Sequence, residues 1–314
     1  MKQENFKFTA PDGVEIYVYK WLPENGIKAA VNIAHGMAET AARYERFAGA
    51  LTANGYAVYA EDHRGHGRTI NDPALAGQAG SDALNRMLED LHQLAEIIRR
   101  DNPAVPLFLL GHSMGSFLAQ GYIARWGGEL RGAILSGAAG RANLLTGAGQ
   151  LIACLEMLLT GRQGKSKLMD KLSFGSFNKH FQPVRTRFDW LSRDAAEVDK
   201  YIADPFCGGI FPAAFFYDLL KFWRQLHRPE KLRQIPGDLP LYFFSGGKDP
   251  LGGDTRGVRQ LIDMYKQSGL GDVSYKFYEE GRHEMLNEIN REIVTADVIK
   301  WLDKHCGFPP GHKN

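Results

Sequence analysis

The chain has 314 residues, of which 44% are hydrophobic and 24% charged, a balance typical of a globular protein with a large buried core. Its net charge of +2 gives no reason to expect a nucleic-acid partner. Three cysteines at unrelated spacings do not suggest a disulfide framework, and no stretch reaches the roughly 18 apolar residues of a membrane span. Because no apolar signal-peptide run follows Met1, we expect a cytoplasmic protein.

Short strands and longer helices alternate from the N-terminus to about residue 139. Two β-rich runs flank Pro11-Asp12-Gly13 and predict a hairpin of Phe6–Thr9 with Val14–Tyr19. The elements expected next are, in order, Ala29–Ala34, Tyr44–Ala53, Tyr56–Ala60, Leu84–Arg100, Pro106–Leu110, Met114–Trp126 and Gly132–Ser136. Repeated strand–helix–strand units predict a mostly parallel sheet with helices on both faces.

The alternation stops near Gly140 and resumes at Leu241. Residues between these points form helix-like segments without a convincing strand, including Leu151–Leu159, Lys167–Leu172 and Phe211–Trp223. The expected elements after the break are Leu241–Ser245, Thr255–Gln267, Ser274–Tyr278 and Glu288–His305. The sequence therefore predicts an α/β core of about eight strands, formed by residues 1–139 and 236–314, with a helical insertion at residues 140–235.

A candidate nucleophile lies between the predicted strand that ends at Leu110 and the helix that begins at Met114. Gly111-His112-Ser113-Met114-Gly115 has the form G-x-S-x-G, in which the serine occupies a sharp turn and the glycines avoid side-chain collisions. The turn exposes the hydroxyl at a helix N-terminus, where the helix dipole favours negative charge. The alternative is a glycine-rich connection without a catalytic role.

A serine hydroxyl needs a base, and the base needs an acid that orients it. His283 follows the last predicted strand and Asp249 the strand before it, so both should lie at the carboxyl edge of the sheet, where sites collect. The order serine, acid, histidine is the one typical of this strand–turn–helix arrangement. Asp254 is the nearest rival for the role of the acid. Asp249, which precedes Pro250, could instead belong only to an Asp-Pro turn.

Two backbone N–H groups are needed to stabilise the oxyanion that forms during acyl transfer. We expect them from Met114, which follows the nucleophile, and from Met37, in the loop after Ala29–Ala34. Gly36 would let this loop approach the substrate, although simple turn chemistry explains it equally well. The segment Asp62–Gly67 contains two histidines and an aspartate, but it lacks a further ligand cluster, so we expect a supporting loop and no metal.

Together these motifs resemble the monoacylglycerol lipase/lysophospholipase group of the α/β-hydrolases over nearly the whole chain. The matching segments are His35-Gly36 with Glu39, Arg43 and Tyr44, then Asp62–Gly67, Gly111–Gly115, Trp190–Asp194, Gly246–Pro250 and His283–Glu288. The resemblance implies the α/β-hydrolase fold, with residues 140–235 as a cap over the active site. It also implies a serine ester hydrolase without a cofactor, which releases fatty acid from a monoacylglycerol or lysophospholipid through an acyl-enzyme.

The cap contains apolar stripes that suit an acyl chain, although they could simply pack the cap on the core. They are Leu151, Ile152, Leu155, Leu158 and Leu159, and Phe211, Phe215, Phe216 and Phe222. Because the candidate catalytic residues all lie outside the cap, we expect a cap-deleted chain to keep hydrolysing small activated esters.

The residues leave several questions of function and assembly open. A small-ester esterase, an aminopeptidase of this fold and a slow-turnover ligand-binding protein remain as alternatives. The expected partner is a lipid-like ester, with no nucleic acid. Transient contact of the cap with a membrane surface and the oligomeric state stay open.

Overall fold

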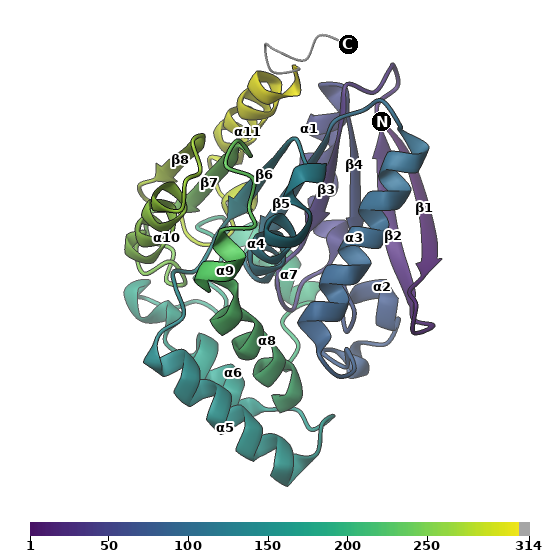
Figure 1. Ribbon diagram of the computed structural model, residues 1–314. Helices are drawn as coiled ribbons and strands as arrows, with labels where there is room; N and C mark the ends of the chain where they lie inside the picture. The colour runs from purple at the N-terminus through teal and green to yellow at the C-terminus, as the bar shows by residue number, and fades with distance from the viewer. Residues whose placement is uncertain (308–314) are drawn as a thin grey trace.

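The computed structural model describes residues 1–307, so the last seven positions of the predicted second core segment lie outside the described part. One eight-stranded sheet runs through the molecule in the order β1-β2-β4-β3-β5-β6-β7-β8 (Figure 1). Strand β2 pairs antiparallel with β1 and β4, and the remaining neighbours are parallel. The predicted sheet of about eight mostly parallel strands is confirmed.

The strands and helices lie close to the segments that the sequence predicts. The strands are β1 (Lys2–Thr9), β2 (Glu15–Leu22), β3 (Ala29–Ala34), β4 (Tyr56–Glu61), β5 (Leu107–His112), β6 (Gly132–Ser136), β7 (Leu241–Gly246) and β8 (Val273–Tyr278). The core helices are α1 (Glu45–Ala53), α2 (Gly67–Ile70), α3 (Ala83–Asp101), α4 (Met114–Trp126), α10 (Arg256–Gln267) and α11 (Arg291–Cys306). The insertion contains α5 (Leu144–Thr160), α6 (Lys167–Phe174), α7 (Ala195–Ala203), α8 (Ala213–Leu226) and α9 (Pro229–Leu232).

Two apolar layers cover the two faces of the sheet. Successive side chains of a strand point to opposite faces, and in β5 Leu109 packs with α3 and α4, whereas Phe108 and Leu110 pack with α1 and α11. All six residues of β5 are buried, which explains why an uninterrupted apolar run is the correct signal for it. Within residues 1–307, no helix combines the length and apolar character needed to cross a bilayer.

Several predicted boundaries are wrong, the largest difference being at helix α5, which begins at Leu144 instead of Leu151. Strand β1 begins at Lys2 instead of Phe6, because the polar residues before Phe6 complete the antiparallel pairing with β2. Helix α11 begins at Arg291 instead of Glu288. The carboxylate of Glu288 accepts backbone N–H bonds from Arg282 and Ile289, both at 3.0 Å, so Glu288 belongs to the loop that precedes the helix.

The insertion enters between two neighbouring strands. Strands β6 and β7 pair in parallel, although the whole of residues 140–235 lies between them in the chain. Helix α8 packs against α3, α4 and α5, while α5 and α6 lie on the side away from the sheet (Figure 1). The insertion therefore rests on one end of the core, beside the loops that follow β3, β5, β7 and β8.

Candidate active site

Ser113 lies in the turn between β5 and α4, in a backbone conformation that is unusual for a residue with a side chain. Its φ is +53° and its ψ is −115°. Such strain persists where a functional side chain must be held in an exposed position. A Cβ on Gly111 would collide with the backbone of Gly115, and a Cβ on Gly115 would collide with the carbonyl of Ala34. Only glycine fits at either position of this turn.

His283 and Asp249 form a buried pair. The imidazole Nδ1 lies 2.9 Å from Asp249 Oδ2, and the carboxylate also accepts the Leu251 N–H at 2.9 Å. Burial alone would lower the pKa of His283, but the charge and hydrogen bond of Asp249 outweigh it, so this pKa lies above its ordinary value. The structure thus brings Asp249 to the histidine, whereas the rival Asp254 is exposed.

Ser113 and His283 line the same cavity, which has a volume of about 250 Å³. Among the described residues, no hydrogen bond joins the two side chains; such contacts often tighten only when substrate is bound. The ring of His283 lies between those of His112 and Trp190, at 4.8 and 5.0 Å between centroids. The histidine is therefore held from both the core and the cap.

The loop after β3 passes close to the serine. A Cβ on Gly36 would lie 3.2 Å from Ser113 Cβ, and Met37 lines the cavity. Within the described part of the chain, the backbone N–H groups of Met37 and Met114 donate no hydrogen bond. Both are therefore available to a substrate oxygen.

A buried network that sequence reasoning did not assemble lies behind this loop. Arg43 donates to Glu39 Oε2 at 2.5 Å and forms a bidentate pair with Glu284 at 2.7 and 2.6 Å. Glu39 also accepts the Gly36 N–H at 2.6 Å and the Tyr44 hydroxyl at 3.0 Å. Each of these residues belongs to a motif of the sequence, yet nothing in the spacing shows that Glu284 meets Arg43.

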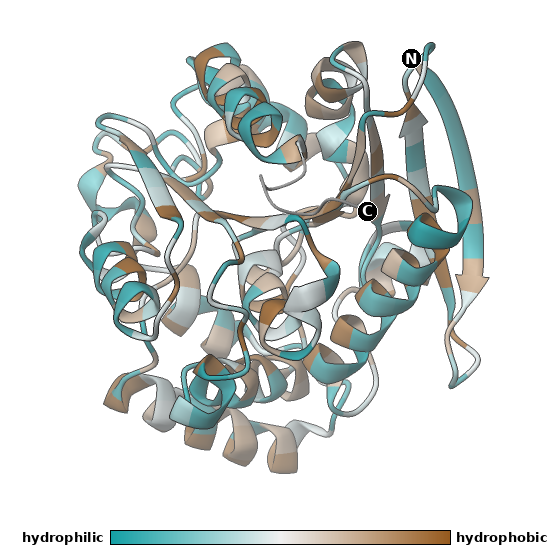
Figure 2. Ribbon diagram, turned by 45° about the horizontal axis from the view of Figure 1, so that its top comes forward, coloured by the Kyte–Doolittle hydropathy of each residue, from teal (hydrophilic) through white to brown (hydrophobic). Residues whose placement is uncertain are grey.

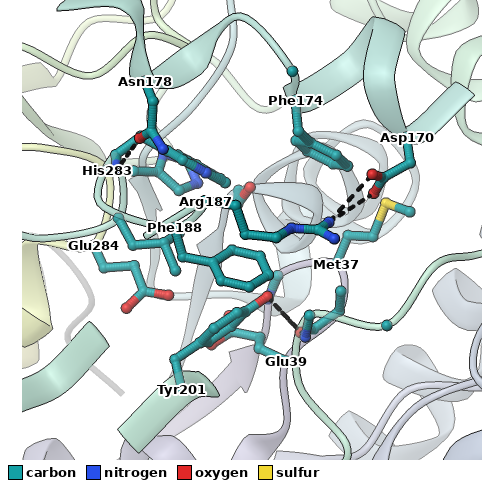
Figure 3. A pocket seen from close by; sticks show the side chains of 18 of the residues that line it. Met37, Glu39, Asp170, Phe174, Asn178, Arg187, Phe188, Tyr201, His283 and Glu284 are labelled. Carbon is teal, nitrogen blue, oxygen red and sulfur yellow. Dashed lines mark hydrogen bonds and ion pairs between the residues drawn. The ribbon is translucent and has the colours of Figure 1, made fainter. Parts of the chain in front are cut away.

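The wall of the cavity opposite the core comes from the cap (Figure 3). Its apolar part consists of Phe174, Phe188, Trp190 and Leu191, and Asp170 pairs with Arg187 at 3.2 Å across its outer side. Each carboxylate that lines the described cavity is paired with an arginine, since Glu39 and Glu284 both bind Arg43.

The two apolar stripes of the cap that suit an acyl chain do not line this cavity. Leu158 and Leu159 of α5 are 74% and 87% exposed on the outermost helix, which is coloured as hydrophobic in Figure 2. Phe211, Phe215, Phe216 and Phe222 are buried among core side chains. The phenylalanines thus follow the alternative of packing against the core, because periodicity identifies an apolar face without identifying what covers it.

Asp62 and the neighbouring histidines support the loop after β3. The Asp62 carboxylate accepts N–H bonds from Ala41 at 2.8 Å and Arg68 at 2.7 Å, and His35 Nε2 accepts the His63 N–H at 3.0 Å. Across residues 1–307, no cluster of three histidine, cysteine or acidic side chains has the arrangement of a metal site.

Comparisons with known proteins agree over most of the chain. The family model described as "Serine aminopeptidase, S33" matches residues 25–290. A monoacylglycerol lipase of Mycolicibacterium smegmatis is 32% identical over 95% of this chain and 96% of its own, and the human monoglyceride lipase is 27% identical over 93% and 88%. The crystal structure of a thermostable carboxyl esterase from Bacillus coagulans superposes with a TM-score of 0.90, at 27% identity, over 98% of this chain and all of that one.

Proposed function

Because the chain belongs to the serine aminopeptidase S33 family and to the monoacylglycerol lipase group of the α/β-hydrolases, we propose that it hydrolyses lipid-like carboxylic esters through an acyl-enzyme on Ser113. Its fold is the α/β-hydrolase fold, and it is a serine ester hydrolase, as the sequence predicts. We propose, beyond this class, the role of each residue in the reaction and the kind of ester that is hydrolysed.

In the proposed mechanism, Ser113 Oγ attacks the ester carbonyl carbon while His283 Nε2 takes the hydroxyl proton. The carbonyl oxygen becomes an oxyanion, which accepts hydrogen bonds from the N–H groups of Met37 and Met114. The carbon–oxygen bond to the alcohol then breaks, and His283 returns the proton to the leaving alcohol. His283 then takes a proton from water, which attacks the acyl-enzyme carbonyl. As the bond to Ser113 Oγ breaks and the fatty acid leaves, His283 returns that proton to Ser113, with Asp249 orienting the imidazole throughout.

One observation carries this proposal. Ser113, His283 and Met37 line one cavity, and the buried Asp249 is bonded to His283. The Met114 N–H follows the serine directly in the strained turn and donates no hydrogen bond among the described residues, so this arrangement supports acyl transfer.

Esters fit this cavity better than peptides with a free amino terminus. An aminopeptidase needs an unpaired carboxylate to bind the ammonium group of its substrate, because a buried charge must be paired. Glu39, Glu284 and Asp170 are all engaged by arginines in the described cavity. The apolar walls of Phe174, Phe188 and Trp190 instead suit an acyl chain, in keeping with the lipases among the relatives.

A substrate panel tests the proposal. We expect kcat/KM to be highest for a monoacylglycerol or lysophospholipid in a series from acetyl to oleoyl, and aminoacyl anilides to stay at the background set by Ser113→Ala. Because each buried CH₂ contributes about 0.8 kcal/mol, four methylenes in contact should raise kcat/KM on the order of a hundredfold. Preference for acetyl esters would favour a small-ester esterase, and turnover of aminoacyl anilides above all esters would contradict the proposal. Single-turnover kinetics with a slow second step would indicate a ligand-binding role.

We propose further that α5 touches the surface of a lipid aggregate while substrate enters. Its outward leucines include Leu144, Leu158 and Leu159, at 94%, 74% and 87% exposure, and Leu168 and Leu172 of α6 are also exposed. Basic side chains at Lys167, Lys171 and Arg162 accompany them. An exposed apolar helix face beside cations is typical of interfacial binding.

The double variant Leu158→Glu/Leu159→Glu should lower kcat/KM on aggregated monoacylglycerol at least about tenfold. Inserting one leucine side chain into the lipid aggregate stabilises the bound enzyme by about 1.5 kcal/mol or more, and the double variant loses this contribution at both positions. Activity on a fully dissolved short ester should not change. The matched control is Ile289→Glu/Ile293→Glu, two side chains at 56% and 58% exposure outside the cap. Equal losses in both double variants would overturn this use of α5.

A further inference from the structure

The cap is bonded directly to the loop that carries Met37. Tyr201, on α7, donates its hydroxyl to the carbonyl oxygen of Ala38 at 2.8 Å. The N–H of Gly208 lies 2.9 Å from the same oxygen and 3.1 Å from the Tyr201 hydroxyl. Figure 3 shows the Tyr201 hydroxyl pointing at this loop, beside Glu39. A carbonyl of the core is thus held by two groups of the insertion.

Ala38 has a backbone conformation that requires such support. Its φ is +57°, in the left-handed region, which costs roughly 1–2 kcal/mol for a residue with a side chain. On the other side of Met37, the Gly36 N–H is fixed by Glu39 Oε1. Met37 therefore lies between two anchored peptide groups, while its own N–H remains unbonded within the described residues. Loss of either anchor would weaken the hold on the Met37 N–H, whose peptide group is also held through the Gly36 carbonyl, 2.7 Å from His35 Nδ1.

The Tyr201 side chain is itself rigidly placed. Tyr201 is buried, and the guanidinium of Arg43 lies 4.8 Å from its ring centroid. Arg43 in turn binds Glu39, the anchor of Gly36. The two anchors of the loop are therefore connected through one arginine.

We propose that Tyr201 is a positioning residue of the oxyanion hole, so that the cap completes a catalytic feature of the core. This inference rests on the proposed function, since it needs Met37 to donate to an oxyanion. The oxyanion exists in the transition state and not in the bound ester, so misplacing the donor should lower kcat and leave KM nearly unchanged.

Tyr201→Phe removes the hydroxyl and keeps the ring over Arg43. We expect kcat to fall at least about tenfold, with KM within about twofold. Losing an oxyanion donor outright costs on the order of 10²–10³, and the effect here should be smaller because Gly208 still donates to Ala38. A trifluoromethyl ketone, which forms an oxyanion on Ser113, should bind more weakly by a similar factor. The pH at which kcat/KM falls by half should not move, because His283 and Asp249 are untouched.

Tyr265→Phe is the matched control, because it removes a buried hydroxyl that donates to Gln120 Oε1 at 3.1 Å on α4, away from the loop. Its kcat should stay within about twofold of wild type. A Tyr201→Phe enzyme with wild-type kcat and ketone affinity would overturn the inference and leave the proposed function standing. The same conclusion would follow if Tyr201→Phe and Tyr265→Phe lowered kcat equally and both lost thermal stability. A wild-type enzyme without ester hydrolysis would overturn both.

Discussion

Replacing Ser113 by alanine should abolish hydrolysis of every ester in the substrate panel, with kcat lower by on the order of 10⁶. The members of a nucleophile–base–acid set act as one unit, so loss of the nucleophile removes the covalent route completely. The strained turn does not need the hydroxyl, because Ser113 Oγ makes no hydrogen bond within the described residues while its N–H binds the carbonyl of Ser136 at 2.9 Å. Thermal unfolding of the variant should match that of wild type.

Labelling by a fluorophosphonate gives an independent measurement of the same residue. The wild-type enzyme should carry one label, which maps to Ser113, and the alanine variant should carry none. Ser268→Ala is the matched control, since the hydroxyl of this partly buried serine, directly after α10, donates only to the Met264 carbonyl at 2.8 Å. Activity of Ser113→Ala within about tenfold of wild type, or a label on another serine, would show that the turn does not hold the nucleophile.

Asp249→Asn should lower kcat by about 10⁴ with little change in KM, because an amide at this position favours the wrong imidazole tautomer. The variant should also change the pH dependence. His283 must be neutral to accept the serine proton, so wild-type kcat/KM should fall as the pH drops through a pKa above 6.5. Without the Asp249 charge, burial of the imidazole dominates and lowers that pKa, so the residual activity of the variant should persist to lower pH.

Asp254→Asn serves as the control for the acid. Asp254 is exposed, and its carboxylate has no contact with His283 among the described residues. Its variant should keep kcat and the pH profile of wild type. If Asp254→Asn were the damaging change, the acid would have been assigned to the wrong aspartate.

The parts of the fold that the sequence predicts are those with a strong local signal. Strands β3 and β6 lie at the predicted residues because all of their residues are buried and, apart from Asn32 and Ser136, none carries a polar side chain. The first residues of β1 give no such signal. They are polar and mostly exposed at the edge of the sheet, and only their pairing with β2 makes them a strand.

The residues of the candidate site also fall into two groups, those that local sequence signals identify and those that such signals miss. Ser113, Asp249 and His283 can be chosen from sequence because each follows a parallel strand, and the carboxyl ends of such strands converge. The contact of Arg43 with Glu284 joins positions 241 residues apart, and that of Tyr201 with Ala38 joins positions 163 apart. No periodicity reports on contacts of this kind, since the first depends on how two loops of the core meet and the second on how the cap docks on the core.

The docking of the cap bears on the prediction that a cap-deleted chain keeps hydrolysing small activated esters. That prediction rests on candidate catalytic residues that all lie outside the cap. In the structure, the Glu284 N–H donates to the Leu191 carbonyl at 2.8 Å, in addition to the bonds from Tyr201 and Gly208 to Ala38. Full deletion of the cap removes these bonds, so we expect the cap-deleted chain to hydrolyse small activated esters measurably but more slowly than the intact chain.

The entry of the cap between paired strands β6 and β7 has a consequence for recombination between relatives. Closing a longer loop between two strands costs only about 0.6 kcal/mol for each doubling of its length, so the sheet tolerates inserts of very different size. We therefore expect a chimera to tolerate exchange of the outward portion that contains α5 and α6, which contributes Phe174 to the cavity wall. The segment from Trp190 to Gly208 should come from the same parent as the core, because it is hydrogen-bonded to the loops that carry Ala38 and Glu284.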